Sequence, residues 1–494
     1  MGLGMGLLPA GMPPSILFIM ADDMGMGEPG WTYANSSHGR LRTPNIDKLA
    51  ADGMKFSDAY AGYTVCAPSR STLFSGRNSG HFKADQPAGW PLLPSLMRDA
   101  GYDVAFFGKS APFDEKPQKE PKGTALQWGL PGAHGVDPFL GQANQAYCHN
   151  MYPTYVTRQN ETLPLPLNSA PNQKSRQLCM ASPASYNYTT DMFADHAIEW
   201  LGTRGSAQPR PFFLYLSFTV PHAGGWGSEP NFPENGAPVP TDLGYDPTGA
   251  WPTVEKDHAA TVTYMDGRVG DTLAALEAAG LARSTAVFFA SDNGAHNEGG
   301  HDVHFFDSTG GLRGFKRSYY EGGVRTPAVV RWPGVVGAGS SSAHPWAFWD
   351  VLPTMLEIAG ASPPAAARLD GTSIVPTLRG NAQPPPKYLY WTWTGVKVGE
   401  DGDGALAPGA QPEATAPPDA APGYAVRVGE WKGVVHSCAD TQGLAPSAAD
   451  TMELYNLTAD RAETRDVSRE HGGVVKMIKQ LLAGEGLSCV CYQC

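Results

Sequence analysis

The sequence predicts an α/β fold in which helices cover a large, mixed, mostly parallel sheet, followed by a smaller C-terminal α+β domain with an antiparallel sheet. Up to about residue 385, apolar runs of strand length alternate with segments of helical periodicity, which is typical of a parallel sheet covered on both faces. From about Tyr388 the chain alternates like antiparallel strands and closes with a helix. We therefore expect one domain over residues 14–385 and a second over residues 386–494.

Four apolar runs are predicted as buried parallel strands because they are short, rich in strand-forming residues and end abruptly. They span residues 15–20, 103–107, 211–220 and 285–290. Polar side chains follow these runs directly: Asp22 and Asp23, Lys109, His222, and Asp292 and Asn293. Ligands of parallel α/β sheets bind beyond the carboxyl ends of the strands. We therefore expect these side chains to share one site.

Two helices of the first domain have recognisable ends. In residues 43–53, Thr43 is the expected N-cap, Pro44 takes the first helical position and Gly53 stops the helix. A second helix is expected over residues 261–280, with a stripe of apolar residues on one side.

The second domain is expected to contain a strand over 388–395, antiparallel strands over 424–435 and a helix over 474–484. The apolar face of that helix is predicted to consist of Val474, Met477, Ile478, Leu481 and Leu482. Residues 400–423 are rich in Gly, Pro and Ala and are predicted as a disordered surface insertion.

The composition limits the class of partner. The chain has 494 residues, with 48 acidic against 36 basic side chains and a formal net charge of −12. This balance argues against nucleic acid and against an anionic membrane as the main partner. No apolar run is long enough for a transmembrane helix. An anionic substrate would need locally clustered bases or a metal ion to overcome the overall field.

Cys66 opens the stretch CAPSRSTLFSGR, in which Arg70 and Arg77 follow closely. Nearby guanidinium groups lower the pKa of a thiol and increase its reactivity. The residues alone leave three roles open for Cys66: a nucleophile, a metal ligand or the precursor of another group. A thiol nucleophile would need a histidine base such as His81 or His149, and the acidic cluster would then have no role.

Asp22, Asp23, Asp292 and Asn293 offer three carboxylates and one amide oxygen at the predicted sheet edge. Such ligands suit a hard cation, Ca²⁺ or Mg²⁺, and without a cation the carboxylates would repel one another. The alternative is that each pair only caps the turn after its strand. The presence of both pairs favours a metal site.

The histidines of the segment AHNEGGHDVH fit no zinc-binding spacing. This segment, which contains His296, His301 and His304, is instead predicted to be a loop that lines the substrate cleft. Arg325 is expected to be a structural residue that pairs with Glu321.

The stretch at Cys66 resembles the signature of the sulfatase family, Cys-x-Pro-Ser-Arg followed by an apolar step and Ser/Thr-Gly-Arg. It reads CAPSR from Cys66 to Arg70 and SGR from Ser75 to Arg77. The segments ILFIMADDMGMGEPG, FFLYLSFTVPHAG, SDNGAHNEGG and LRGFKRSYYEGGVRTPAVVRWPG follow in the family's order, so the resemblance covers nearly the whole chain. It implies an alkaline-phosphatase-like fold and the hydrolysis of sulfate esters to an alcohol or phenol and inorganic sulfate, as in arylsulfatases.

The resemblance also implies a modified nucleophile. A separate formylglycine-generating enzyme would oxidise Cys66 to Cα-formylglycine, whose hydrated form attacks sulfur, expels the alcohol and then releases sulfate. An oxygen of the modified residue would share Ca²⁺, with Mg²⁺ as the alternative ion, with four ligands: Asp22, Asp23, Asp292 and Asn293.

The same resemblance implies roles for the surrounding cations and histidines. Arg70 would hold the diol, Lys109 and Lys316 would bind the sulfate and the leaving oxygen, and His222 would be the general acid. Many members carry a histidine where this sequence has Ala111, in GKSAP. His149, in the stretch CHN, is a candidate to replace that histidine as the base that assists the final release of sulfate.

Two other functions stay open from the sequence. A phosphoric mono- or diester hydrolase would use the same scaffold, although such enzymes usually carry Ser or Thr at the position of Cys66. A secreted protein that binds without catalysis is the other alternative, because of Ala111.

The expected location is secreted or lumenal, as in a lysosome-like compartment, although no signal peptide is visible. Four Asn-x-Ser/Thr triplets begin at Asn35, Asn160, Asn187 and Asn456. Six cysteines remain besides Cys66, a number compatible with three disulfides.

Overall fold

The computed structural model describes residues 12–32, 39–81, 90–113, 129–145, 147–168, 186–205, 210–224, 236–365, 367–393, 423–436, 451–485 and 487. The predicted insertion at 400–423 lies outside these residues, except for Gly423, which begins a strand. Of the seven cysteines, only Cys66 and Cys148 are described, and no disulfide joins either of them to another described residue. The other five cysteines, and Asn35, lie outside the described residues.

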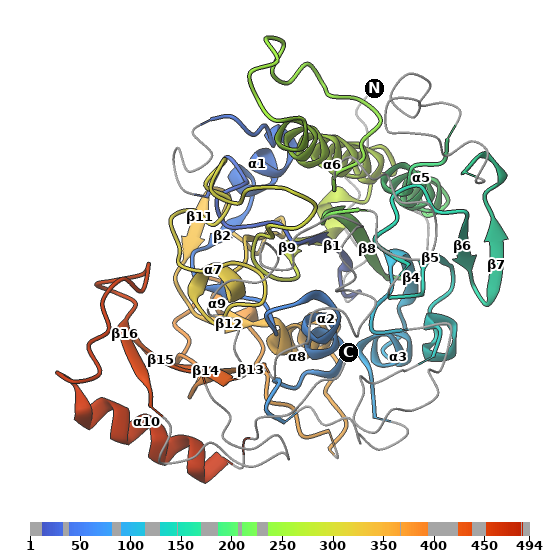
Figure 1. The fold of residues 1–494 in the computed structure, drawn as a ribbon. Helices are drawn as coiled ribbons and strands as arrows, with labels where there is room; N and C mark the ends of the chain where they lie inside the picture. Colours follow the sequence, from blue (N-terminus) through green and yellow to red (C-terminus); the bar gives the residue numbers. More distant parts are fainter. Residues whose placement is uncertain are drawn as a thin grey trace.

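A ten-stranded sheet forms the centre of the molecule (Figure 1). Its strands lie in the order β11-β2-β10-β9-β1-β8-β4-β5-β6-β7, and all neighbours from β9 to β5 are parallel. β10 runs antiparallel to β2 and β9, and β6 and β7 form an antiparallel hairpin. The strands are β1 Ser15–Asp22, β2 Met54–Phe56, β4 Asp103–Lys109, β5 Phe139–Gln142, β6 Tyr155–Arg158, β7 Glu161–Pro164, β8 Phe212–Pro221, β9 Thr285–Ser291, β10 Ala328–Arg331 and β11 Ser340–Ser342. The predicted mixed, mostly parallel sheet is confirmed.

Helices cover both faces because the central strands are apolar on both sides. Ile16 and Phe18 of β1 pack into one core, and Leu17 and Ile19 pack into the other. The first face is covered by α2 Cys66–Ser75, α3 Leu93–Asp99, α8 Val351–Ile358 and α9 Val375–Leu378. The second face is covered by α1 Pro44–Ala51, α5 Thr189–Gly202 and α6 Thr253–Ala278. Figure 1 shows α1, α5 and α6 together on one side of the sheet.

Shorter elements complete this part of the chain. A two-stranded parallel sheet pairs β3 Ala59–Tyr60 with β12 Trp346–Ala347, and α7 is a single turn, Glu321–Val324. The described 3₁₀ turns are η1 Pro131–His134, η2 Pro166–Asn168, η4 Ala282–Ser284 and η5 Phe348–Asp350.

The C-terminal part is an antiparallel four-stranded sheet, β13-β14-β15-β16, packed against helix α10 Gly472–Glu485 (Figure 1). Its strands are β13 Leu389–Trp393, β14 Gly423–Val428, β15 Trp431–Val435 and β16 Glu453–Asn456. Trp391 packs on Tyr60 of β3, and its indole N–H donates to the Ala61 carbonyl at 2.9 Å. The predicted α+β character is confirmed, while the boundary between residues 385 and 386 stays a prediction.

Three details of the predicted elements differ from the structure. α6 begins at Thr253 rather than near residue 261, because its first turns bury polar residues, Glu255 and His258, that interrupt the apolar pattern. The Met477 side chain of α10 is 41% exposed, so it does not belong to the buried face formed by Ile478 and Leu482. Thr43 precedes α1 as expected, but its hydroxyl donates to the Asp47 carboxylate at 3.0 Å instead of capping backbone amides.

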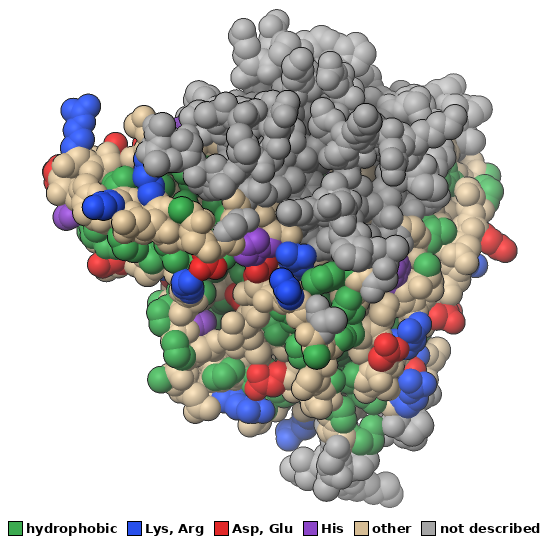
Figure 2. Space-filling model, turned by 90° about the horizontal axis from the view of Figure 1, so that it is seen from below, with side chains coloured by type: hydrophobic (Ala, Val, Ile, Leu, Met, Phe, Trp, Pro, Cys, Tyr) green, Lys and Arg blue, Asp and Glu red, His purple; other side chains and the backbone are tan. Residues whose placement is uncertain are grey.

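No helix in the described part of the chain combines the length and the apolar character needed to cross a membrane. On the face shown in Figure 2, acidic and basic side chains are interspersed with apolar ones. The net charge of −12 is therefore not gathered into one acidic patch among the coloured residues of this face.

Candidate active site

Two neighbouring parallel strands deliver the predicted metal ligands to one point. β1 and β9 are paired up to Ala21 and Ser291, so the residues that follow each strand meet at the carboxyl edge of the sheet. The Asp23 backbone N–H donates to Asp292 Oδ1 at 3.0 Å, and Asn293 Nδ2 donates to Asp23 Oδ1 at 2.7 Å. Asp22 lies in the same buried cluster. The structure therefore brings together all four oxygen-bearing side chains expected from the sequence.

The chemistry of this cluster fits a hard cation. Ligand atoms of Asp22, Cys66 and Asp292 all lie within 4.8 Å of one another. Asp22 Oδ1 and Asn293 Oδ1 are buried, and neither accepts a hydrogen bond from any described residue. A buried oxygen without a donor is costly unless a cation takes the donor's place. The cluster can therefore hold Ca²⁺ or Mg²⁺ with oxygen ligands.

Cys66 is the first residue of helix α2, and its side chain is buried beside the acidic cluster. Ser69, one turn further on, fixes this end of the helix: its hydroxyl accepts from the Gly62 N–H at 3.0 Å and donates to the Asp292 carbonyl at 2.5 Å. Helix α2 ends at Ser75 and is capped by Gly76, whose φ of 69° is a left-handed conformation that glycine adopts without strain. The signature stretch is therefore a helix whose start points at the cluster.

The pKa of Cys66 differs from the expectation that two arginines would lower it. Burial raises the pKa of the Cys66 thiol to about 11. Burial outweighs the nearby positive charges: the Arg70 guanidinium binds Asp292, and the Arg77 guanidinium lies 5.0 Å from the centre of the Trp90 ring. A thiolate is disfavoured here, so the structure argues against Cys66 as a sulfur nucleophile in its unmodified form.

Arg70 is fully buried and connects the acids to strand β8. Its Nε and Nη2 lie 2.8 and 2.7 Å from Asp292 Oδ2, and Nη1 donates to Tyr215 at 3.1 Å and to Ser217. This forked contact fixes the orientation of the Asp292 carboxylate. Arg70 thus orients Asp292, which is one of the candidate metal ligands.

Two lysine–aspartate–histidine sets flank the cluster. Lys109 Nζ donates to Asp22 Oδ2 at 2.8 Å and lies 3.0 Å from His149 Nε2. Lys316 Nζ donates to Asp23 Oδ2 at 2.9 Å and lies 2.8 Å from His222 Nε2. The two imidazole rings are stacked, with centroids 3.8 Å apart and planes 4° apart.

This pairing fixes the charge of each group. Burial disfavours the charged form of Lys109, but Asp22 outweighs it and holds the pKa of Lys109 well above its usual value. Burial and Lys316 lower the pKa of His222 to about 4, and burial and His222 lower the pKa of His149 well below its usual value. The lysines are therefore cations and the histidines are neutral at pH 7.

Burial raises the pKa of Asp292 to about 7, with a further contribution from Asp22.

His149 joins the site although it lies far from the GKSAP stretch. It stands after β5 and reaches Lys109, which ends β4. Ala111, at the position where many sulfatases carry histidine, is buried two residues after Lys109. The structure thus places His149, the candidate replacement for the family histidine, in contact with Lys109, two residues before Ala111.

Sequence reasoning missed several polar side chains of the site. Glu298 is buried, its Oε2 lies 3.1 Å from Lys316 Nζ and 3.4 Å from His222 Nε2, and its Oε1 accepts from Arg317. Its sequence signal is weak, because it lies in a loop seven residues after β9. Ser217 and Tyr215, which bind Arg70, lie inside an apolar strand where polar residues are easily read as structural.

The histidine-rich segment that we expected to line the substrate cleft contributes His296 and Glu298 to the surroundings of the cluster, where their ligand atoms lie within 4.8 Å of each other and of Asp23. That this segment lines the substrate cleft stays a prediction. His296 and His301 are buried, and the ring of His301 stacks on His258 of α6 with centroids 3.8 Å apart. His301 Nδ1 is 2.6 Å from Glu255 Oε2. His304 is exposed. Arg325 pairs with Glu321 at 2.5 Å, as predicted for a structural residue.

Solved structures share this fold over nearly the whole chain. Ps i-CgsB superposes with a TM-score of 0.70 at 21% identity, covering 97% of this chain and 95% of that one. BT4656, solved with its substrate D-glucosamine-2-N,6-O-disulfate, gives 0.63 at 19% identity and covers 96% and 97%. The phosphonate monoester hydrolase of Agrobacterium radiobacter gives 0.59 at 20% identity and covers 97% of both chains. These likenesses show that the chain has the alkaline-phosphatase-like fold.

Sequence comparison gives the family. The sulfatase family profile matches residues 14–361, which is more than half of the chain. N-acetylgalactosamine-6-sulfatase of Mus musculus is 29% identical over 434 residues, covering 79% of this chain and 75% of the relative. Arylsulfatase A of Bos taurus is 30% identical over 410 residues, covering 78% and 71%. Steryl-sulfatase of Mus musculus is 29% identical over 441 residues, covering 76% and 66%. The chain belongs to the sulfatase family, whose named relatives are sulfuric ester hydrolases.

Proposed function

We propose that this protein is an arylsulfatase-type enzyme that hydrolyses sulfate monoesters with a Cα-formylglycine made from Cys66 and a bound Ca²⁺. The observation that carries the proposal is the buried cluster at the start of α2, where Cys66 meets carboxylates from two separate strands. Cys66 is unsuited to act as a thiolate because burial raises its pKa to about 11. Conversion to an aldehyde by a formylglycine-generating enzyme, before the chain folds around this residue, removes that limitation.

Ca²⁺ would be held by Asp22, Asp23, Asp292 and Asn293, with Mg²⁺ as the alternative ion. A hard cation here would polarise the oxygen nucleophile at position 66 and neutralise charge on the sulfate oxygens. The support for it is the pair of buried oxygens without donors, Asp22 Oδ1 and Asn293 Oδ1. A cation would also favour the ionised form of Asp292, which is disfavoured while the site holds no positive ion.

The two lysines would bind the sulfate group. Lys109 and Lys316 are both buried and cationic, and each is held by one of the two adjacent aspartates. Charges fixed in this way need no reorganisation when negative charge develops on the sulfate oxygens and on the leaving oxygen. Arg70 would keep Asp292 oriented toward the cation and hold the nucleophile from the same side.

His222, in the role of general acid, would deliver a proton to the leaving oxygen together with Lys316. Its Nδ1 lies 2.6 Å from the Ala223 carbonyl, so this nitrogen carries the proton, and Nε2 accepts from Lys316. The proton would therefore come from the Lys316–His222 pair as negative charge develops beside it. His149, stacked on His222 and bonded to Lys109, would be the base that replaces the absent histidine at Ala111.

We further propose a secreted or lumenal location. Asn160 is exposed in the turn between β6 and β7, where a glycosyltransferase has access to its side chain. Relatives named as N-acetylgalactosamine-6-sulfatase and steryl-sulfatase support esters of sugars and other alcohols as natural substrates besides aryl sulfates.

The test is a pair of assays with aryl sulfate and aryl phosphate. We expect the wild-type protein to hydrolyse the sulfate ester far faster, and Cys66→Ala to lose essentially all turnover while it remains folded. Ser71→Ala is the matched control, because Ser71 lies in the same helix but its hydroxyl donates to the Ala67 carbonyl and, among the described residues, contacts no member of the cluster. Turnover that survives Cys66→Ala would point to another nucleophile, and a preference for phosphate would contradict the proposed reaction.

A further inference from the structure

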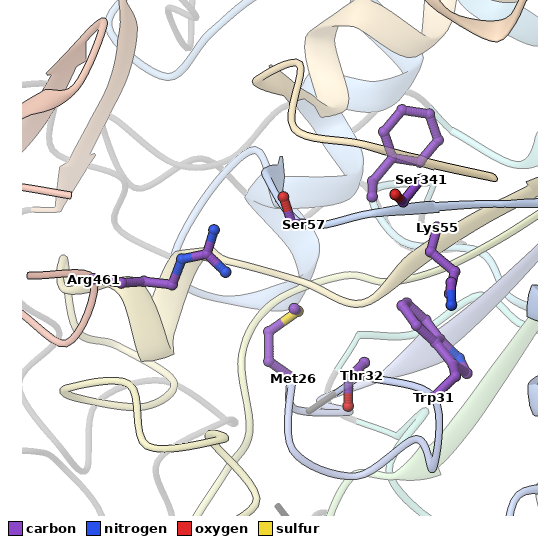
Figure 3. Close-up of a pocket in the computed structure, with 8 residues that line it drawn as sticks. Met26, Trp31, Thr32, Lys55, Ser57, Ser341 and Arg461 are labelled. Atoms are coloured by element: carbon purple, nitrogen blue, oxygen red, sulfur yellow. The ribbon is translucent and has the colours of Figure 1, made fainter. Parts of the chain in front are cut away.

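A pocket lies beside the loop that follows β1 (Figure 3). Its volume is about 170 Å³, and its walls come from four separate parts of the chain, one of which is Ser341 of β11. Trp31 and Thr32 belong to the loop after β1, Lys55 and Ser57 come from β2 and the residue that follows it, and Arg461 comes from the C-terminal part. None of the pocket residues belongs to the proposed catalytic cluster.

The pocket lies on the same side of the molecule as the catalytic cluster. β10 runs antiparallel to both β2 and β9, so β2 points in the same direction as β9 and β1. The carboxyl end of β2, at Phe56 and Ser57, therefore lies at the edge that carries Asp22 and Asp292. β2 is three strands away from β1 in the sheet. At the usual spacing between strands, this places the pocket about 14 Å to the side of the cluster.

The pocket carries positive charge in a chain that is acidic overall. Lys55 is partly exposed, and no described residue forms an ion pair with its ammonium group. Arg461 lies 3.3 Å from Asp58, but that carboxylate also binds Arg325 and Arg427. Asp58 thus contacts three guanidinium groups, of which Arg325 also pairs with Glu321. The two cations, Lys55 and Arg461, attract an anion to the pocket.

The remaining walls suit a sugar ring. Figure 3 shows the indole of Trp31 below the end of the Lys55 side chain, with Arg461 reaching in from the opposite side. An indole offers a flat apolar face of the size of a sugar ring, and such amphipathic rings are common where one partner is partly polar. The hydroxyls of Thr32 and Ser341 lie at the same pocket and can bond ring hydroxyls.

We propose that this pocket binds a second sulfated sugar unit of an extended substrate while another unit occupies the catalytic cluster. The proposal rests on the proposed sulfatase activity and adds the substrate class to it: a sulfated oligo- or polysaccharide. The pocket supplies what such a unit presents, which is a sulfate anion, hydroxyl groups and the apolar face of a sugar ring. The pocket contributes affinity for the chain and takes no part in the chemical step.

The test separates binding from turnover. Binding of a sulfated galactan hexasaccharide, and of its chemically desulfated form, is measured by titration calorimetry on full-length Cys66→Ala protein, so that the ligand is not consumed. Lys55→Gln and Arg461→Gln are each added to this background. Lys476→Gln is the matched control, because Lys476 is an exposed lysine on α10, away from the pocket. Kinetics on a small aryl sulfate are measured with the same substitutions in protein that retains Cys66.

We expect Lys55→Gln and Arg461→Gln each to raise the Kd for the sulfated hexasaccharide about tenfold. The control variant and the desulfated ligand show that charge is responsible: Lys476→Gln leaves the Kd unchanged, and the desulfated form binds much more weakly to the parent protein. kcat/KM for aryl sulfate stays within about twofold in all three variants. Equal affinity of both pocket variants and the parent, or equal binding of the two ligands, would overturn the proposal. A lack of aryl sulfate turnover in the otherwise unchanged protein that retains Cys66 would instead contradict the proposed function.

Discussion

At the scale of single residues, the site is organised around two aspartates that follow one another in the chain. Asp22 and Asp23 lie at the end of β1. Asp22 pairs with Lys109, which contacts His149, and Asp23 pairs with Lys316, which contacts His222. Asp23 has a positive φ of 67°, a conformation that is uncommon for a residue other than glycine. This turn separates the two carboxylates so that they serve opposite sides of the cluster.

Lys316→Gln tests the role of the fixed cation at residue scale. The substitution keeps a hydrogen-bond donor of similar length but removes the charge held by Asp23 and Glu298. We expect kcat for aryl sulfate to fall about 10²–10³-fold, because one charge that stabilises the leaving oxygen is lost. Steady-state kinetics give the measurement, and Lys476→Gln serves as the surface control. A change in KM with an unaltered kcat would show that Lys316 only binds the substrate.

At the scale of elements, strand ends were predictable and loops were not. The apolar runs that became β1, β4, β8 and β9 end in charged or polar residues, so their contribution to the site followed from the strand pattern. Helix α6 begins earlier than expected because the burial of Glu255 and His258 depends on partners in distant loops, such as Glu28 for His258. Glu298 was missed for the same reason, since its position depends on Lys316 and Arg317.

The C-terminal sheet is joined to the catalytic part by a buried chain of ion pairs. Lys432 of β15 has a wholly buried side chain, and its Nζ lies 2.8 Å from Glu321 of α7 and 3.0 Å from Glu463. Arg325 holds the other side of Glu321. These contacts join β15 to the turn that precedes β10, so the second sheet and the main sheet support each other.

Lys432→Ala tests this connection between elements. Removal of the lysine leaves two buried glutamates with less positive charge nearby, and we expect the free energy of unfolding to fall by about 3–5 kcal/mol. The measurement is equilibrium denaturation in urea. Lys476→Ala, an exposed substitution on α10, should change the free energy of unfolding by no more than about 0.5 kcal/mol. Equal stability of the two variants would show that the buried ion pairs do not hold the sheets together.

At the scale of the whole molecule, the proposed cation would tie together segments far apart in the chain. Asp22 ends β1, Asp292 directly follows β9, and Cys66 begins α2. A ligand bound by the folded state alone stabilises it, by about 2.7 kcal/mol at a hundredfold excess over its Kd. The fold therefore predicts that calcium removal lowers the stability of the entire catalytic part.

Thermal unfolding with and without Ca²⁺ tests this prediction, and its pH dependence tests the role of Asp292. Burial raises the pKa of Asp292 to about 7, whereas an unfolded aspartate ionises near pH 4, at about 3.9. In metal-free protein, this carboxyl therefore contributes a loss of stability as the pH rises from about 4 toward 7. Calcium binding must displace the remaining proton, so the calcium-induced rise in Tm should be larger at pH 8 than at pH 6.

The control for this measurement is Asp292→Asn, which removes the titrating group. Its response to calcium should be small and nearly independent of pH. A calcium-induced shift in Tm that is equally large in the wild type and in Asp292→Asn would place the ion elsewhere.

The central claim is that position 66 carries an oxidised side chain next to a cation, in a site built by two distant strand ends. Peptide mass analysis of protein purified from its native host, on the fragment that contains residue 66, tests it most directly. We expect the mass of an aldehyde or its hydrate in place of the thiol at position 66. An unmodified thiol at that position in fully active protein would contradict the account.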